Sequence, residues 1–206
     1  MENKLNELLT NASSLFMTYG IKSLTMDDIS SRLGMSKKTL YNYVSDKNDL
    51  VCKCIDKLIQ QKECRMAEVC ELGQNAIEEL FLVSQYSSEQ INEINPSIFF
   101  DLKKYHPAAW SLLEESRKNH TLESTKANLR KGISEGLFRD DFSVDAIAQI
   151  YLAMVENIFS SSNLLESKMS MAEYHRNMFD YHIRGIANEK GIKLINQSVL
   201  KLKPNE

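Results

Sequence analysis

Apolar residues recur along most of this chain at intervals of three and four positions, which is the spacing of one buried face of an α-helix. Over residues 3–19 this apolar face is formed by Leu5, Leu8, Leu9, Ala12, Leu15, Phe16 and Tyr19. The same period continues through the later segments, and only 7 Gly and 3 Pro interrupt it. Because strands and hairpins need turn residues at short intervals, the pattern predicts an all-α protein of about nine helices.

Two of the predicted helices are short and lie within residues 25–44, separated by a glycine. Thr25 can cap the first of them, and Gly34 can end it in the left-handed conformation. Ser36 can cap the second. The positions that would face the core are Ile29, Leu33, Leu40 and Val44. Two short helices joined by such a turn form a helix-turn-helix, whose second helix enters the major groove in proteins that bind DNA.

The outward face of the second short helix carries side chains that suit DNA. With Leu40 and Val44 facing inward, a rotation of about 100° per residue directs Lys38 and Asn42 away from the core. Lys can bond guanine and Asn can bond adenine in the major groove. The neighbouring positions, whose polar groups can reach phosphates, are Lys37, Thr39 and Tyr41. A solvated helix face has a similar composition, but the glycine turn and the two caps favour DNA contact.

The stretch SLTMDDISSRLGMSKKTLYNYVSDKNDL resembles the DNA-binding signature of TetR-type transcriptional regulators. The resemblance is specific over roughly the first sixty residues and only architectural beyond them. It implies that operator phosphates are contacted by Thr25, Thr39, Tyr41, Tyr43 and Lys47. The chain departs from the family at Val44, where Phe is usual, and at Lys38, where a small residue is common. The predicted DNA-binding set consists of these phosphate contacts together with Lys37, Lys38 and Asn42.

The same resemblance predicts two domains. Residues 1–50 form a DNA-binding head, and residues 51–206 form a larger helical domain for effector binding and dimerisation. A helix that starts at Asp46 or Lys47 and continues to about Val69 would support the head and connect it to the second domain. In the family, the last two helices dimerise, and the helices between them and the head enclose an inducer.

Proline and glycine mark the boundaries of the middle helices. Asn95 followed by Pro96 predicts a helix start, with the cap and the first helical residue in favoured places. Pro107 predicts the start of the next helix, which Gly132 and Gly136 are expected to end.

A ligand pocket is one of two interpretations of the middle helices. One face of the helix predicted from about Asn75 to Asn92 is apolar at its start and carries serines further along. This change fits the polar wall of a pocket or simply a more exposed end. Aromatic residues are densest between positions 99 and 110, where core packing and pocket lining both remain open. The candidates for effector contact are Phe81, Ser84, Phe99, Phe100, Tyr105, Trp110, Tyr151 and Met154.

Two later helices predict a dimer. Residues 144–161, capped by Ser143, carry apolar side chains on two faces, and a further helix is predicted from about Met171 to Asn188. A helix that is apolar on two sides must be covered on two sides, and a second copy of the chain is the simplest cover. The candidate interface residues are Leu152, Val155, Phe159, Tyr174, Met178 and Tyr181. The tail after Gly191 is expected to be loosely held.

The charge of the chain is compatible with a specific operator but not with general coating of nucleic acid. The net charge is −3, and residues 1–50 contain six Lys or Arg and six Asp or Glu. A small set of bases must therefore carry the DNA contact. No segment approaches the roughly 18 uninterrupted apolar residues of a membrane span, and the first residues lack a signal-peptide core. We expect a cytoplasmic protein with no membrane partner.

Cysteine and histidine give little support for metal or redox chemistry. The four cysteines, at positions 52, 54, 64 and 70, all lie on one predicted helix. Cys52 and Cys54 would project about 200° apart, so they cannot share one metal ion. Reduced helix cysteines are favoured, and a thiol sensor stays open. His175 and His182 share a helix face but lie about 10.5 Å apart along it, so a surface or interface role is expected. No cofactor, metal or catalytic residue is predicted.

These observations favour one function over two others. The leading hypothesis is a dimeric, sequence-specific DNA-binding regulator, most simply a repressor released from a palindromic operator by a small-molecule effector. The alternative is an all-helical small-molecule sensor or carrier whose head binds protein instead of DNA. Such a head should offer exposed apolar anchors, which the second short helix lacks. An enzyme is a distant third, because no phosphate loop, metal signature or triad spacing is present.

Overall fold

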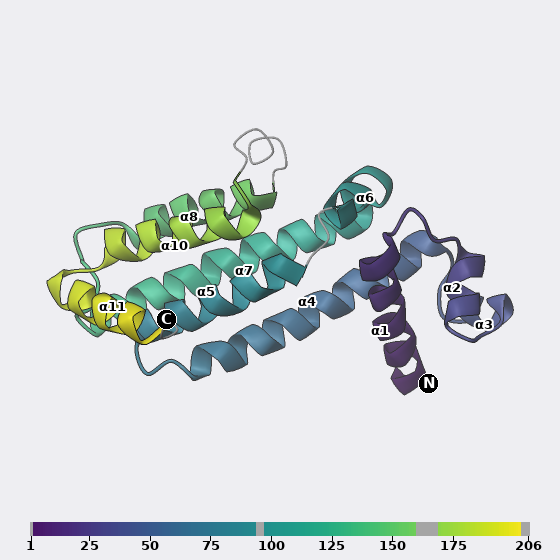
Figure 1. Cartoon of the computed structure of the whole chain (residues 1–206), viewed down its shortest axis with the longest axis horizontal. Helices are drawn as coiled ribbons and strands as arrows, with labels where there is room; N and C mark the ends of the chain where they lie inside the picture. The colour runs from purple at the N-terminus through teal and green to yellow at the C-terminus, as the bar shows by residue number, and fades with distance from the viewer. Residues whose placement is uncertain (1, 94–96, 160–168, 203–206) are drawn as a thin grey trace. The chain divides into compact units, whose positions relative to one another are not determined.

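The computed structural model describes residues 2–93, 97–159 and 169–202. Ten α-helices follow one another in these residues, which contain no strand, only an isolated antiparallel bridge between Phe138 and Ala187. The all-α prediction is confirmed (Figure 1), with one helix more than the approximate count expected from the sequence. The predicted helix start at Asn95 and Pro96 lies outside the described residues.

The helices group into two compact units. Unit 1 comprises Met1–Glu63 and Ile94–Arg117, and unit 2 comprises Cys64–Glu93 and Lys118–Glu206. Unit 1 contains α1 (Glu2–Tyr19), α2 (Met26–Arg32), α3 (Lys37–Tyr41) and α6 (Ser97–Tyr105). Unit 2 contains α5 (Ala76–Glu93), α8 (Val144–Phe159), α10 (Met171–Ile186) and α11 (Glu189–Leu202). The two longest helices, α4 (Lys47–Glu71) and α7 (Pro107–Ser134), contribute to both units. The predicted functional division at residue 50 stays a prediction.

The core of unit 1 joins α1, the two short helices, the start of α4 and α6. Its fully buried side chains include Ile29 of α2, Leu40 of α3, Leu50 of α4 and Leu102 of α6. Tyr19, predicted to lie on the buried face of α1, is instead exposed, and the guanidinium of Arg32 lies 4.2 Å from the centre of its ring. The Tyr19 ring therefore lies beside a cation at the surface and does not pack in the core.

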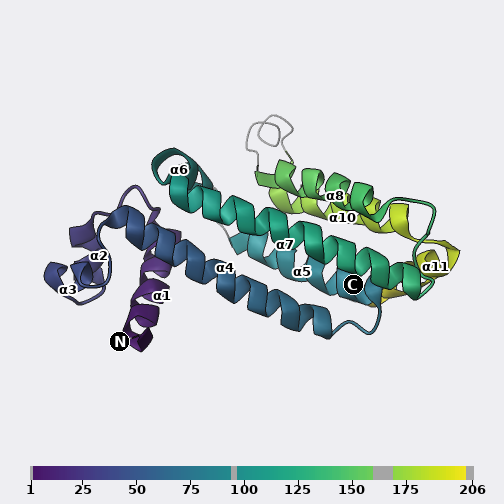
Figure 2. The ribbon, with the colours of Figure 1, turned by 180° about the vertical axis from the view of Figure 1, so that it is seen from behind.

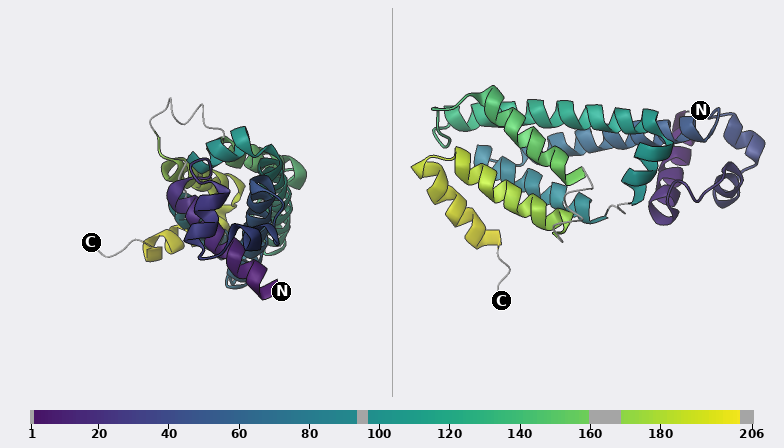
Figure 3. Two further views of the ribbon diagram at one scale, coloured as in Figure 1. Left: turned by 90° about the vertical axis from the view of Figure 1, so that its right-hand side faces the viewer. Right: turned by 90° about the horizontal axis from the view of Figure 1, so that it is seen from above.

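The core of unit 2 forms where α10 packs on both α5 and α8 (Figure 1), and α7 runs along α5 (Figure 2). Its buried side chains include Ile77 of α5, Leu129 of α7, Ala148 of α8 and Ile183 of α10. The chain reverses direction after α10, and α11 contacts α5 (Figure 3).

Two glycines lie inside helices, although Gly132 was expected to end one and Gly191 to precede a loosely held tail. Gly132 lies inside α7, which continues to Ser134 before Gly136 adopts a φ of 65°. Gly191 lies inside α11, and Ile195 of this helix is fully buried, so the prediction of a loosely held tail is wrong for residues up to 195. In both cases the missing side chain makes room for a neighbour. A Cβ at Gly132 would lie 2.0 Å from the Phe138 ring, and one at Gly191 would lie 2.2 Å from the Leu137 carbonyl oxygen.

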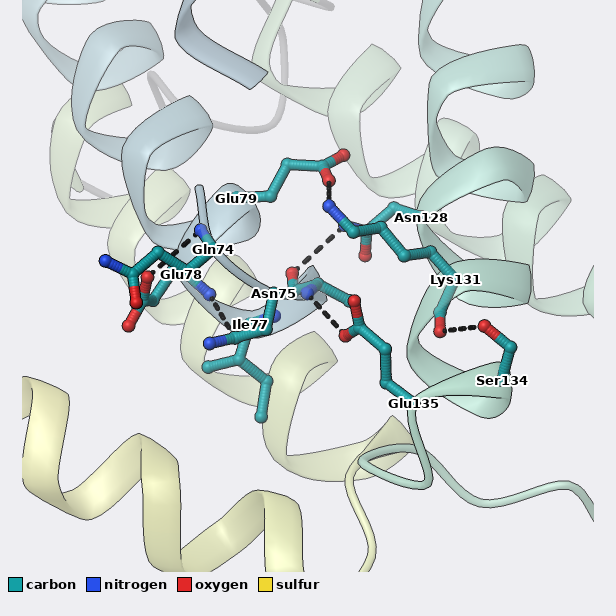
Figure 4. Close-up of polar contacts among 10 residues, drawn as sticks. Gln74, Asn75, Ile77, Glu78, Glu79, Asn128, Lys131, Ser134 and Glu135 are labelled. Carbon is teal, nitrogen blue, oxygen red and sulfur yellow. Dashed lines mark hydrogen bonds and ion pairs between the residues drawn. The ribbon is translucent and has the colours of Figure 1, made fainter. Parts of the chain in front are cut away.

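The first turn of α5 is held by the side chains of Asn75, which precedes it, and Glu135, which follows α7 (Figure 4). Asn75 Oδ1 accepts hydrogen bonds from the N–H groups of Ile77 and Glu78, at 3.1 and 3.0 Å. The Glu135 carboxylate accepts a further one from the N–H of Ala76, at 2.8 Å. These three bonds satisfy N–H groups that a helix start otherwise leaves without a partner.

Asn128 of α7 completes this arrangement, and its replacement by alanine is expected to destabilise the protein by about 1–3 kcal/mol. The Asn128 side chain is buried and donates to the Ala76 carbonyl at 3.0 Å, so its loss leaves that buried acceptor without the bond. Urea unfolding followed by circular dichroism measures the change. Asn119→Ala, an exposed site on the same helix, is the control and should change the free energy of unfolding by less than about 0.5 kcal/mol.

His175 and His182 of α10 are buried in unit 2, so the prediction of a surface or interface role is wrong. The centres of the His182 and Tyr151 rings lie 4.3 Å apart, and no hydrogen-bond partner is present for His175 Nδ1 in the described residues. Burial lowers the pKa of His182 to about 4, and burial together with the charge of Arg176 lowers the pKa of His175. Both imidazoles are therefore neutral in the folded protein at neutral pH.

Acid is expected to destabilise the protein through these two histidines. Their folded pKa values lie below the unfolded value of about 6.5, so the stability they contribute is complete above pH 6.5. For His182 it falls by up to about 1.4 kcal/mol per pH unit as the pH drops toward 4, and His175 contributes to the fall in the same direction. Urea unfolding between pH 7 and 5 should show a shallower pH dependence for His182→Gln than for the wild type. Equal slopes would contradict a neutral, buried His182, since all other titrating groups are common to both proteins.

Candidate nucleic-acid interface

The first helix of the helix-turn-helix begins with a reciprocal cap. Thr25 Oγ1 accepts the N–H of Asp28 at 3.1 Å, and the Asp28 carboxylate accepts the N–H of Thr25 at 2.9 Å. The Thr25 hydroxyl also donates to the same carboxylate at 2.6 Å. These bonds hold the pKa of the Asp28 carboxyl below its usual value. The predicted cap at Thr25 is confirmed.

The turn and the second helix also follow the sequence pattern. Gly34 has a φ of 66°, in the left-handed region that favours glycine, and ends the turn after α2. Ser36 Oγ accepts the N–H of Thr39 at 3.0 Å and so caps α3. Leu40 and Val44 are buried, as predicted. Local sequence therefore builds both helices, and the buried pair fixes which face of α3 points outward.

The outward face of α3 is exposed, with Lys37, Lys38, Thr39, Tyr41 and Asn42 all accessible. Three of these side chains, Lys38, Tyr41 and Asn42, form no hydrogen bond or ion pair with the residues that the structure describes. Their ammonium, hydroxyl and amide groups are available to a partner molecule. An amide and an ammonium on an exposed helix are the groups that read adenine and guanine edges.

Three of the other five predicted contacts have side-chain partners at the surface of the fold, the first being Lys37, which pairs with Asp27. The Thr25 hydroxyl bonds Asp28, and the Thr39 hydroxyl lies 2.8 Å from that of Ser36. The remaining two, Tyr43 and Lys47, are half-buried, unlike the exposed α3 set. The predicted phosphate contacts of all these residues stay predictions.

Lys47 has a structural role that the sequence pattern did not indicate. Its Nζ donates to the carbonyl of Leu24 at 2.5 Å, which joins the start of α4 to the residue before the α2 cap. Burial lowers the pKa of this ammonium, whereas the charges of Asp101 and Asp28 oppose that shift. Lys47 thus positions α2 whether or not it also contacts a phosphate.

Contacts from α6 support the same region, and no motif in the sequence pointed to them. The buried carboxylate of Asp101 accepts the backbone N–H of Lys22 at 2.9 Å, in the turn between α1 and α2. Next to α6, His106 Nδ1 lies 2.6 Å from Asn48 Oδ1 at the start of α4. The Lys22 ammonium lies 4.9 Å from the centre of the Tyr105 ring. Residues far apart in the sequence thus hold both ends of the helix-turn-helix.

The predicted effector residues are divided between the two units. In unit 1, the Phe99 and Trp110 rings make an edge contact at 6.3 Å, and Phe100, with 58% of its surface exposed, does not line an enclosed space. Tyr105 packs with Phe100 and with lysines. The members of the set that lie in unit 2 are Phe81, Ser84, Tyr151 and Met154. The effector pocket stays a prediction.

A surface depression of about 580 Å³ lies elsewhere in unit 2, at the junction of α10 and α11. It is lined by Arg139, Ala187, Asn188, Glu189, Ile192 and Lys193, none of which was predicted to contact an effector. The Arg139 guanidinium is engaged with the Gly185 carbonyl, at 2.7 and 3.1 Å. This arrangement joins the segment after α7 to the end of α10.

The predicted dimer residues divide into core and surface. Leu152 and Met178 are buried within a single chain, so for them the interface prediction is corrected to a core role. Val155, Phe159 and Tyr174 are half-buried, and the Tyr174 hydroxyl accepts a hydrogen bond from Asn157 at 3.1 Å. Tyr181 is 74% exposed. Sequence spacing alone did not tell which apolar face of α8 the other helices of the chain already cover.

The described part of the chain carries neither a metal-binding cluster nor a membrane-spanning helix. No three His, Cys, Asp or Glu side chains there are grouped closely enough to hold a metal ion. None of the described helices is long and apolar enough to cross a membrane. All four cysteines are free, and burial raises the pKa of the Cys54 thiol to about 11, which keeps it protonated and unreactive.

Comparison with known proteins agrees with the geometry of unit 1. Residues 8–53 match the family described as "Bacterial regulatory proteins, tetR family". An uncharacterised helix-turn-helix transcriptional regulator of Bacillus subtilis, YvaF, is 24% identical over 169 residues, which cover 82% of this chain and 88% of that protein. The repressor KstR2 of Mycobacterium tuberculosis is 23% identical over 71% of this chain and 75% of its own length.

Similar solved structures extend the likeness to the rest of the fold. A TetR-family regulator from Agrobacterium tumefaciens superposes with a TM-score of 0.69 at 20% identity, covering 91% of this chain and 99% of that one. Its family assignment agrees with the matched residues 8–53, which contain the capped α2, the glycine turn and α3. Residues 8–53 therefore form a DNA-binding domain of the TetR type, and the chain as a whole is similar in sequence and fold to transcriptional regulators of that family.

Proposed function

We propose that the protein is a homodimeric repressor that binds a palindromic operator through α3 and is released by a small-molecule effector. The observation that carries the proposal is the exposed set Lys38, Tyr41 and Asn42 on a short helix capped at Ser36. Its groups can bond base edges and phosphates without breaking any hydrogen bond or ion pair formed with the described residues. The relative KstR2 is named a repressor, which supports repression here.

Dimerisation is proposed through α8 and α10, with a revised set of residues. Ile150 of α8 and Tyr181 of α10 are 54% and 74% exposed on two helices that pack against each other, so both side chains are accessible to a second copy of the chain. They replace the buried Leu152 and Met178 as the proposed contacts. A two-fold dimer would place two copies of α3 on half-sites about 34–36 Å apart, or a multiple of that spacing.

Effector binding is proposed for the helices of unit 2. An effector can shift the affinity for DNA only by the difference in its own affinity for the two conformations of the protein. The proposed site of action is the cytoplasm, where a bacterial operator is accessible, and we propose no catalytic activity.

The function is tested with the full chain and DNA. Selection from a random pool, together with the region upstream of its own gene, should yield a palindromic site bound at least about 1,000-fold more tightly than random DNA at physiological salt. Sedimentation should show two chains per site. Mass spectrometry of ligands retained through native purification should identify a compound that weakens operator binding. Equal affinity for the selected and the random DNA would overturn the proposed function.

A further inference from the structure

An ion pair lies within the predicted DNA-contact region of unit 1. The ammonium of Lys37, in the first turn of α3, lies 2.8 Å from a carboxylate oxygen of Asp27, in the first turn of α2. The two side chains are 53% and 69% exposed. Asp27 is also two residues from Thr25, a predicted phosphate contact. A negative charge therefore lies where phosphates are expected.

The balance of charges in residues 1–50 makes this ion pair important for the affinity of the protein for DNA. Their six bases and six acids leave no general attraction for DNA. Within this stretch, Lys22 and Arg32 lie over tyrosine rings, and Lys47 bonds the Leu24 carbonyl. On the first turn of α3, Lys38 is available directly, whereas Lys37 is available only if it leaves Asp27.

We propose that Asp27 competes with DNA phosphates for the ammonium of Lys37 and thereby lowers the affinity of the protein for all DNA sequences. This inference rests on the proposed function. An exposed ion pair is weak, so a phosphate can displace Asp27, but the freed carboxylate then repels that phosphate. Phosphate contacts carry no sequence information, so the effect is the same on operator and on random DNA.

The consequence is a limit on non-specific binding. Contacts to the DNA backbone supply essentially all of the affinity for random sites, which far outnumber operators in a chromosome. Base contacts by Lys38 and Asn42 are unaffected by Asp27, since neither side chain pairs with it. The carboxylate of Asp27, beside a lysine that contacts the DNA backbone, thus lowers the affinity of the regulator for random DNA.

The test is Asp27→Asn in the full chain, measured by fluorescence anisotropy with operator and with random DNA. We expect about 3- to 10-fold tighter binding to both at 0.1 M salt, with gains that agree within about two-fold. The dependence of log K on log salt should steepen by up to about one unit, because an unpaired Lys37 releases a further counterion. Asp56→Asn, which removes an exposed acid from α4 in the same unit, should change either affinity by less than about two-fold.

A double-mutant cycle decides whether the effect acts through Lys37. In the Lys37→Ala background, Asp27→Asn should change the affinity by less than about two-fold. An equal gain in both backgrounds would overturn the competition, as would the absence of any gain in a wild-type background that binds its operator. If the wild type binds no DNA selectively, the proposed function fails instead, so the two failures are distinguishable.

Discussion

Replacing Asn42 with alanine is expected to lower the affinity for the operator by about 10- to 100-fold, while the affinity for random DNA stays within about two-fold. Asn42 lies at the exposed end of α3, and its amide forms no hydrogen bond with the described residues. In the proposed complex this amide bonds the edge of an adenine, which random DNA offers only by chance. The affinity for the operator should therefore decrease without a matching decrease for random DNA. Sites selected with the variant should show a relaxed base preference at one position of each half-site.

Asn11→Ala provides the matched control, since it makes the same change at an exposed position of α1. Both affinities should be unchanged in this variant, and thermal unfolding of both variants should match the wild type. A parallel loss of operator and random affinity in Asn42→Ala would show that Asn42 contacts the backbone. No loss at all would remove it from the interface.

Replacing Gly132 with alanine is expected to lower the free energy of unfolding by about 2–4 kcal/mol. In an exposed helix interior the same change would stabilise the protein by about 1 kcal/mol, because alanine restricts the unfolded chain. Here the new Cβ would lie 2.0 Å from the Phe138 ring, which is buried. Phe138 cannot withdraw easily, since its N–H bonds the Gly132 carbonyl at 3.1 Å and its backbone pairs with Ala187.

Gly185→Ala in α10 is the control that isolates packing from helix propensity. A Cβ at Gly185 would meet nothing within 4 Å, so this change should stabilise the protein by about 0.5–1 kcal/mol. Urea unfolding of the two variants should give changes of opposite sign. Stabilisation in both would mean that Phe138 can repack around the added methyl group.

The candidate DNA-binding site was largely predictable from the sequence because its geometry depends on near neighbours. The caps at Thr25 and Ser36 close hydrogen bonds over three residues, and Gly34 supplies a conformation that few other residues adopt. Once Leu40 was assigned to the core, helical geometry alone placed Asn42 on the outside. The contact of Asp27 with Lys37 links residues ten positions apart across the turn, and no local rule indicated it.

The sequence by itself thus determined the all-α class, the limits of most helices, and the identity and outward face of the DNA-binding motif. Only the tertiary structure decided which apolar faces are covered within one chain, where α6 attaches, and which glycines tolerate a side chain. Met178 and His182 are buried because other helices of unit 2 reach them. Gly132 tolerates no side chain because the Phe138 ring occupies the space beside it. Periodicity specifies that a face must be buried, but the partner that buries it is set by contacts between residues distant in the sequence.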